Sequence, residues 1–246
     1  MAAIASMIGP TPAVPGRSDV TNAECWLSPI VEELKHFYEP QPEAPRDAFV
    51  FYLWYVLGQR TTPARRDAAM AALKRIPALT PDAVWKAPRA KLQAAIAYVG
   101  PPEERLHAVI AGVEVFRRYR EIERAVRGPI LQARRSTRLL RALGPVGAQW
   151  MLLAAGDHPI LPRHAGVGRL AMRLGVVPPP CCDGARAPWR AARVVAATVP
   201  RDVRFLKPAI LYLSHHAAAT CTVAEPHCRV CPLAVDCAYA HAPVVS

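Results

Sequence analysis

The chain has 246 residues, of which 52% are hydrophobic and 20% are charged. This composition is typical of a soluble globular protein of one large domain or two small ones. The apolar stretch at residues 48–57 is too short to cross a bilayer, and residues 1–15 lack the positive start and long apolar core of a signal peptide. We therefore expect a cytoplasmic protein rather than a secreted or membrane protein.

Lysine and arginine outnumber aspartate and glutamate by 31 to 19, which leaves a net charge of +12. Such an excess is typical of proteins that bind a polyanion, nucleic acid above all. A basic surface without a binding role would give the same count. A GC-rich genome also enriches arginine in its proteins. The charge favours nucleic acid and does not establish it.

Helix signals follow one another along the chain, with no convincing strand alternation, so the sequence predicts an all-α fold. Residues 1–23 carry Pro, Ala, Gly and Ser without periodicity and are expected to form a disordered arm. Asp47 precedes the apolar segment 49–57, which is dense enough for a central buried helix. The other predicted helices, separated by short Gly and Pro breaks, cover residues 28–38, 64–76, 81–85, 88–98, 102–119, 129–142, 148–155, 164–174, 188–198 and 203–215.

The segment 139–155 predicts two helices joined by a tight turn, Gly144-Pro145-Val146-Gly147. Two glycines let the backbone turn sharply and approach a ligand closely. Amides at the start of the second helix can then point at a phosphate. An ordinary helical hairpin without a ligand has the same pattern.

Four of the seven cysteines lie close together near the end of the chain, spaced C-x6-C-x2-C-x5-C. An odd total and the lack of a secretory signal argue against a disulfide framework. Four thiolates this close indicate one metal site, and the spacing alone fits both a structural zinc and an iron–sulfur cluster. The candidate ligands are Cys221, Cys228, Cys231 and Cys237. The remaining cysteines, Cys25, Cys181 and Cys182, are expected to be a buried thiol and a loop pair.

The hairpin, followed about seventy residues later by this cysteine loop, resembles the endonuclease III family of helix-hairpin-helix DNA glycosylases. The loop matches the family's [4Fe-4S] loop in every spacing, including the proline after the third cysteine. Residues 57–62 resemble the family's LSxQxT segment, whose glutamine enters the gap left by an extruded base; Gln59 is the counterpart. Residues 167–170 resemble the start of the helix that follows the family's catalytic aspartate.

The resemblance implies two helical lobes with DNA bound in the cleft between them. The first, like a six-helix barrel, spans 46–156 and carries the hairpin; the second combines 24–45 with 157–246 and ends in the cluster loop. It also implies a structural [4Fe-4S] cluster on the four cysteines, and a monomer bound to double-stranded DNA that is damaged or abasic. The expected DNA contacts are Gln59, Gly144, Val146, Gly147 and Arg169.

The departures from the family fall on the chemistry. At the position of the lysine that forms a Schiff base in bifunctional members stands Gln149, which argues against lyase activity only. At the position of the aspartate stands His164. A carboxylate about 4 Å from the developing cation contributes ~4 kcal/mol at an effective dielectric of about 20, or about three decades in rate. Asp157, in the turn 156–159, and His164 acting as a general base are the candidates to replace it. A turn residue and a packed histidine are the plain alternatives.

Three functions remain open at this point. The resemblance favours a monofunctional DNA N-glycosylase with altered catalytic residues, and this is the function that we prefer from the sequence. The chemistry favours a catalytically silent protein that binds lesions or abasic sites. A more distant possibility is a cluster-bearing redox or interaction module with no role on DNA. The first two differ only in what His164 and Asp157 do.

Overall fold

The computed structural model describes residues 26–76, 79–177 and 184–242. Within these ranges the chain forms twelve α-helices and a few short 3-10 turns, with no strand, so the predicted all-α fold is confirmed. No helix in this part of the chain has the length and apolarity that a membrane span requires. The predicted arm at 1–23 and the cysteines Cys25, Cys181 and Cys182 lie outside the described residues.

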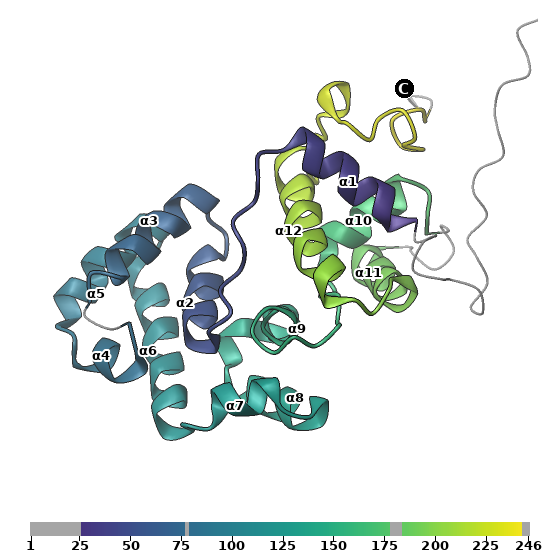
Figure 1. Cartoon of the computed structure of the whole chain (residues 1–246). Helices are drawn as coiled ribbons and strands as arrows, with labels where there is room; N and C mark the ends of the chain where they lie inside the picture. Colours follow the sequence, from purple (N-terminus) through teal and green to yellow (C-terminus); the bar gives the residue numbers. More distant parts are fainter. Residues whose placement is uncertain (1–25, 77–78, 178–183, 243–246) are drawn as a thin grey trace, which may run out of the picture.

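The helices form two sets, with α9 between them (Figure 1). One set is consecutive in sequence: α2 (Ala48–Gly58), α3 (Pro63–Leu73), α4 (Pro81–Lys86), α5 (Arg89–Ile96), α6 (Pro102–Arg118), α7 (Ile122–Arg127) and α8 (Ile130–Leu139). The other joins the two ends of the chain: α1 (Leu27–Phe37), α10 (Ala165–Arg173), α11 (Ala187–Thr198) and α12 (Val203–Ala219). Helix α9 (Gly144–Ala154) packs on α2 and α8 of the first set and on α12 of the second. The predicted lobe boundary at residue 156 stays a prediction.

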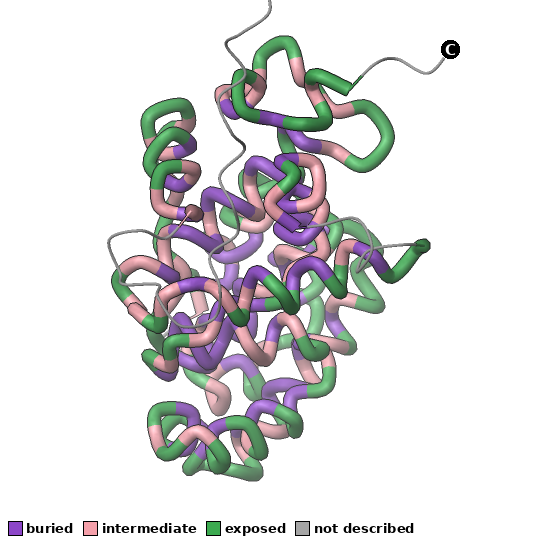
Figure 2. Tube along the Cα trace, turned by 90° about the vertical axis from the view of Figure 1, so that its right-hand side faces the viewer, coloured by how far each residue is buried: buried purple, intermediate pink, exposed green. Residues whose placement is uncertain are grey.

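Helix α2 is the buried centre of the first set. The Asp47 side chain caps it by accepting a hydrogen bond of 2.8 Å from the Val50 amide, as expected for an N-cap aspartate. Most of its side chains are buried, because α3, α6, α7 and α9 all pack around it. At its other end Arg105 of α6 donates to the Val56 carbonyl (2.8 Å) and to the Gln59 carbonyl. Figure 2 shows the buried positions gathered inside the molecule, whereas the loop after α12 is mainly exposed or half-buried.

Two elements differ from the sequence prediction. Helix α7 was not predicted, because its six residues are too few to show a helical period. Helix α9 begins at Gly144 rather than at 148. The tight turn is the 3-10 turn Arg141–Leu143, and Pro145 lies in the first turn of α9, where its missing N–H costs nothing.

Gly168 allows α10 and α11 to touch. A Cβ atom there would lie 1.8 Å from the Pro188 carbonyl oxygen, which belongs to backbone and has no room to move. We expect Gly168→Ala to cost ~1–3 kcal/mol as an overpacked contact, which lowers the melting temperature by ~2–4 °C per kcal/mol in a chain of this size. Gly128→Ala is the control, because its nearest neighbour is the mobile end of the Gln132 side chain, 3.3 Å away. Equal melting temperatures for the two variants would contradict this packing.

Candidate functional site

The hairpin of α8 and α9 forms one wall of a basic groove. Together with residues 160–163 it encloses a volume of about 500 Å³. Among the described residues, four arginines and no acidic side chain line this groove: Arg134, Arg138, Arg141 and Arg163. Three of them lie on α8 and the turn after it, and the fourth faces them from the segment that leads into α10. The groove is therefore positive on both sides, a surface suited to phosphate.

The two hairpin glycines have different roles. Gly144 has a φ of +59°, and no atom lies within 4 Å of the place where a Cβ would stand, so its backbone is open to a ligand. At Gly147, by contrast, a Cβ would lie 2.4 Å from the ring of Tyr55, so this glycine lets α9 pack on α2. Val146 carries a first-turn amide, the kind that helix geometry leaves without a partner inside the helix. The structure therefore places Gly144 in the lining of the groove and turns Gly147 toward the core, whereas Val146 is half-buried and is not one of the lining residues.

Gln59 lies next to the hairpin. It follows the last residue of α2, and its side-chain Nε2 donates to the Ala142 carbonyl at 2.9 Å. Because Ala142 belongs to the 3-10 turn, this bond ties the end of α2 to the hairpin. Arg60, the next residue, adopts a left-handed conformation with φ of 53°. The insertion of Gln59 into an opened duplex stays a prediction. In this structure its side chain is held by the hydrogen bond to Ala142.

Gln149 and the segment before His164 are held together by one hydrogen bond. The Oε1 of Gln149 accepts from the Arg163 amide at 2.9 Å. This bond ties Gln149, which lines the groove, to the residue directly before His164. The sequence contains no sign of this bond, because it joins residues 14 apart across a loop.

The ring of His164 lies at the start of α10 and is mostly buried. Its Nδ1 atom is buried and has no hydrogen-bond partner among the described residues. Burial lowers the pKa of His164, and the charge of Arg169 lowers it further. The ring is therefore neutral near pH 7 and supplies no charge of either sign.

Asp157 is held away from the groove. Its φ of 54° makes it a left-handed turn residue, and its carboxylate pairs with Lys207 of α12. That hydrogen bond lowers the pKa of Asp157, with smaller contributions from Arg46 and Arg127. Asp157 does not line the groove, and neither does any other carboxylate of the described residues.

Arg169 caps a helix. Its guanidinium donates to the carbonyl of Ala217 (2.7 Å) and to that of Cys221 (3.1 and 2.9 Å), which closes the C-terminal end of α12. The family resemblance predicts that Arg169 contacts DNA. That contact stays a prediction, and the observed bonds occupy the side chain elsewhere.

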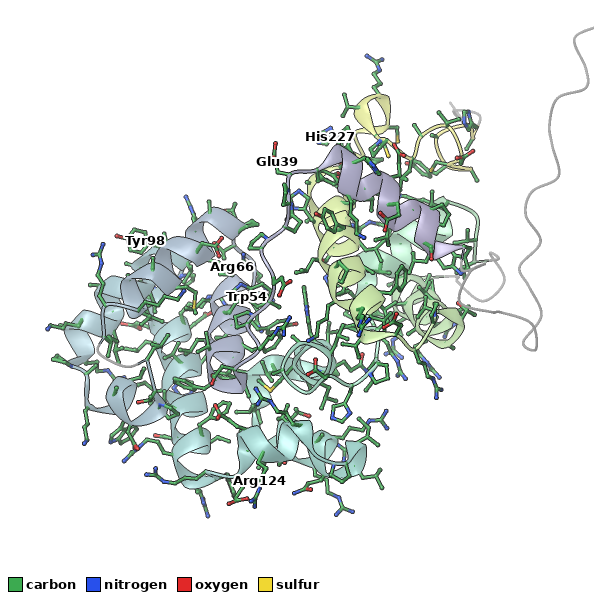
Figure 3. All side chains as sticks on the ribbon, in the orientation of Figure 1. Glu39, Trp54, Arg66, Tyr98, Arg124 and His227 are labelled. Atoms are coloured by element: carbon green, nitrogen blue, oxygen red, sulfur yellow. The ribbon has the colours of Figure 1, made fainter. Side chains whose placement is uncertain are left out.

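An aromatic cluster fills the space between α9 and α2. Trp150 packs edge-on against Trp54 (5.6 Å between centroids) and Tyr55 (5.9 Å). Arg66 of α3 stacks over Trp54 at 4.4 Å, and Figure 3 shows these two side chains together beside α2. Both tryptophans are buried, so this cluster is core rather than the lining of an open base pocket.

The four cysteines of the C-terminal loop share one small cavity of about 20 Å³, walled by α10 and the end of α12. All four are free thiols. No three His, Cys, Asp or Glu side chains of the described residues are grouped closely enough to hold one metal ion. A single zinc needs its four sulfurs within ~2.3 Å of one point, whereas a four-iron cluster takes one thiolate at each iron and spreads them. Four thiols around one cavity are a donor set that both a zinc ion and an iron–sulfur cluster use.

Basic side chains reach two of these sulfurs. Arg173 donates to the Cys221 sulfur at 3.2 Å and to the Thr222 carbonyl at 2.6 Å, while its guanidinium stacks over Tyr239. His216 has its Nε2 3.7 Å from the Cys231 sulfur. Burial lowers the pKa of His216 to about 4, so its ring is neutral. The sequence pointed to the cysteines by their spacing and gave no sign of Arg173.

Comparison with solved structures identifies the fold. No family model matches the chain, and no curated protein does. A trapped endonuclease III–DNA covalent intermediate, an estranged-adenine complex, has a TM-score of 0.66 and 17% identity, over 90% of this chain and 98% of that one. A thermostable thymine-DNA glycosylase has a TM-score of 0.64 and 17% identity, over 87% and 96%. A non-covalent endonuclease III–DNA complex has a TM-score of 0.65 and 18% identity, over 90% and 97%. The chain therefore has the all-α fold of these DNA glycosylase structures, as the resemblance predicted.

Proposed function

We propose that this chain binds double-stranded DNA at a damaged or abasic nucleotide, as a cytoplasmic monomer, through the groove between α8, α9 and residues 160–163. The observation that carries the proposal is the composition of this groove, four arginines and no acid around about 500 Å³. Arginine binds phosphate bidentately and keeps its charge at any pH of interest. Two of the structures with the same fold are complexes with DNA, which supports this assignment.

The site favours binding without excision of the base. Cleavage of a glycosidic bond develops positive charge on the sugar, and a nearby carboxylate is what stabilises it. No carboxylate of the described residues lines the groove, His164 is neutral, and Asp157 is paired with Lys207. In this proposal the arginines hold DNA, and the described part of the groove supplies no negative charge to speed the reaction.

A monofunctional DNA N-glycosylase is the second candidate, and His164 is the observation in its favour. A buried polar atom without a partner is uncommon in a folded protein, and the Nδ1 of His164 is one. A neutral imidazole is also a general base for water. In this candidate His164 activates the water, and the missing carboxylate makes the reaction slow.

Four thiolates around one cavity support a [4Fe-4S] cluster held by Cys221, Cys228, Cys231 and Cys237. When bound, it would brace the loop after α12, and no step of a reaction passes through it. Purified protein should be brown, with a broad visible absorbance and about four irons per chain. Colourless protein with one zinc per chain would contradict this cofactor.

Binding to short duplexes tests the proposed function. We expect the full chain to bind a duplex with a stable abasic-site analogue more tightly than the same duplex undamaged. The logarithm of the affinity should fall with that of the salt concentration with a slope of about −0.9 per phosphate contact, so four arginines predict about −3 to −4. Binding that is absent or insensitive to salt would reject the DNA role and leave a redox or interaction module. A panel of duplexes with damaged bases, scored for release of free base, separates the two candidate functions. No release supports binding without excision, and release supports the monofunctional glycosylase.

Lyase chemistry should be absent. Gln149 has no amine to attack the sugar of an abasic site, so no Schiff base forms with it. We expect borohydride treatment of the chain with abasic DNA to give no covalent adduct, under conditions in which endonuclease III is trapped. A trapped species would show that another amine of this chain reaches the sugar.

A further inference from the structure

A network of partly buried hydrogen bonds runs from the segment after α1 to the cysteine loop. The Tyr38 hydroxyl lies 2.6 Å from the Thr220 hydroxyl and 2.8 Å from the Nδ1 of His216. The other ring nitrogen of His216, Nε2, lies 3.7 Å from the Cys231 sulfur. His216 is fully buried and Thr220 is 7% exposed. Segments that are almost 180 residues apart thus meet at one of the four candidate ligands.

The chemistry of a metal-bound cysteine fixes which group donates in each hydrogen bond of this network. A thiolate has no hydrogen and only accepts, so the Nε2 of His216 must carry the proton. A fully buried ring without a carboxylate partner stays neutral, which makes its Nδ1 an acceptor. Tyr38 must then donate to Nδ1, and its oxygen accepts from the Thr220 hydroxyl. With that single arrangement, each of these side chains has a hydrogen-bond partner within the network.

We propose that His216, held in one tautomer by Tyr38 and Thr220, donates a hydrogen bond to the Cys231 thiolate, and so positions and electronically tunes this ligand of the proposed [4Fe-4S] cluster. The inference rests on the proposed cluster. Partners of this kind orient metal ligands and stabilise negative charge on them. The cluster becomes more negative when it gains an electron, so an N–H group pointing at one of its sulfurs favours the reduced form.

The test compares anaerobically purified full-length variants by reduction potential and by the rate at which a chelator removes iron. His216→Leu removes the donor and keeps the volume, and Tyr38→Phe removes only the group that fixes the tautomer. His215→Gln is the matched control: its ring packs on Tyr38 at 4.7 Å and has no hydrogen bond to a cysteine among the described residues. Circular dichroism confirms that each variant is folded.

We expect His216→Leu to lose iron roughly 10-fold faster or more, the usual effect of removing such a partner. Its potential should move to more negative values. Tyr38→Phe should shift both quantities in the same direction by less, and His215→Gln should leave both unchanged. Wild-type protein with iron but equal potentials in all variants would overturn the inference and leave the cluster in place. Wild-type protein without iron would reject the cluster itself, and the inference with it.

Discussion

Replacing His164 with aspartate should give base-release activity to a chain that, on the proposed function, binds DNA without excising the base. The position lies at the N-cap of α10, directly after Arg163, which lines the groove and is bonded to Gln149. Aspartate is a favoured N-cap residue, and His164 makes no capping bond that the variant would lose. A carboxylate about 4 Å from the developing cation is worth ~4 kcal/mol at a dielectric of about 20, so the rate should rise about a thousandfold.

The measurement is free base released from duplexes that contain uracil, mismatched thymine or an oxidised pyrimidine. His164→Asn is the control, because it has the same shape as the aspartate and no charge. We expect release by the aspartate variant only, at abasic-site affinity within a few-fold of wild type. Equal release by the asparagine variant, or release by wild type at the aspartate variant's rate, would contradict the role given to charge at this position.

Removing one ligand of the proposed cluster should unfold the C-terminal loop. In the 3-10 turn Cys228–Val230 no residue is buried, and few side chains after residue 220 are. A segment with so small a core depends on its metal for stability. Cys221→Ser is therefore expected to lose its iron and to open the loop at Arg229, which is exposed.

Iron content and limited digestion with trypsin measure this effect. Cys221→Ser should hold less than half of the wild-type iron and be cut after Arg229 at least about tenfold faster, the scale expected when a metal ligand is lost. Cys25→Ser is the matched control, because Cys25 lies outside the four-cysteine motif. Full iron content in Cys221→Ser would remove this cysteine from the ligand set.

The helices could be predicted where their signals are local. Asp47 before an apolar run, and threonine–proline pairs at 62–63 and 80–81, mark the starts of α2, α3 and α4, and the structure confirms all three. The sequence predicts the start of α9 at residue 148 instead of Gly144. The error arises because the structural reason for the glycine at 147 lies in a distant part of the chain. Gly147 makes room for Tyr55, which comes from a helix about ninety residues earlier.

In the candidate site, too, the sequence predicts local patterns and does not predict contacts between distant segments. The cysteine spacing is a local pattern, as are the residues that stand at the lysine and aspartate positions. What each residue touches depends on distant segments: Arg163 on Gln149, Asp157 on Lys207, and Arg169 on the end of α12. Arg169 shows the limit most clearly. The motif around it suggested a contact with DNA, and the fold gives it three hydrogen bonds inside the protein.

Removing charge from the groove tests the central claim most directly. Arg138→Ala with Arg141→Ala takes two positive charges from its wall, and Arg75→Ala with Arg89→Ala takes two exposed charges from just after α3 and the start of α5, neither of which lines the groove. With abasic duplex at ~0.1 M salt, the groove variant should bind roughly tenfold more weakly or worse, with a salt slope smaller by about two. The variant outside the groove should keep the wild-type affinity to within a few-fold. Equal losses in the two double variants would contradict the account, because DNA would then respond to net charge and not to this groove.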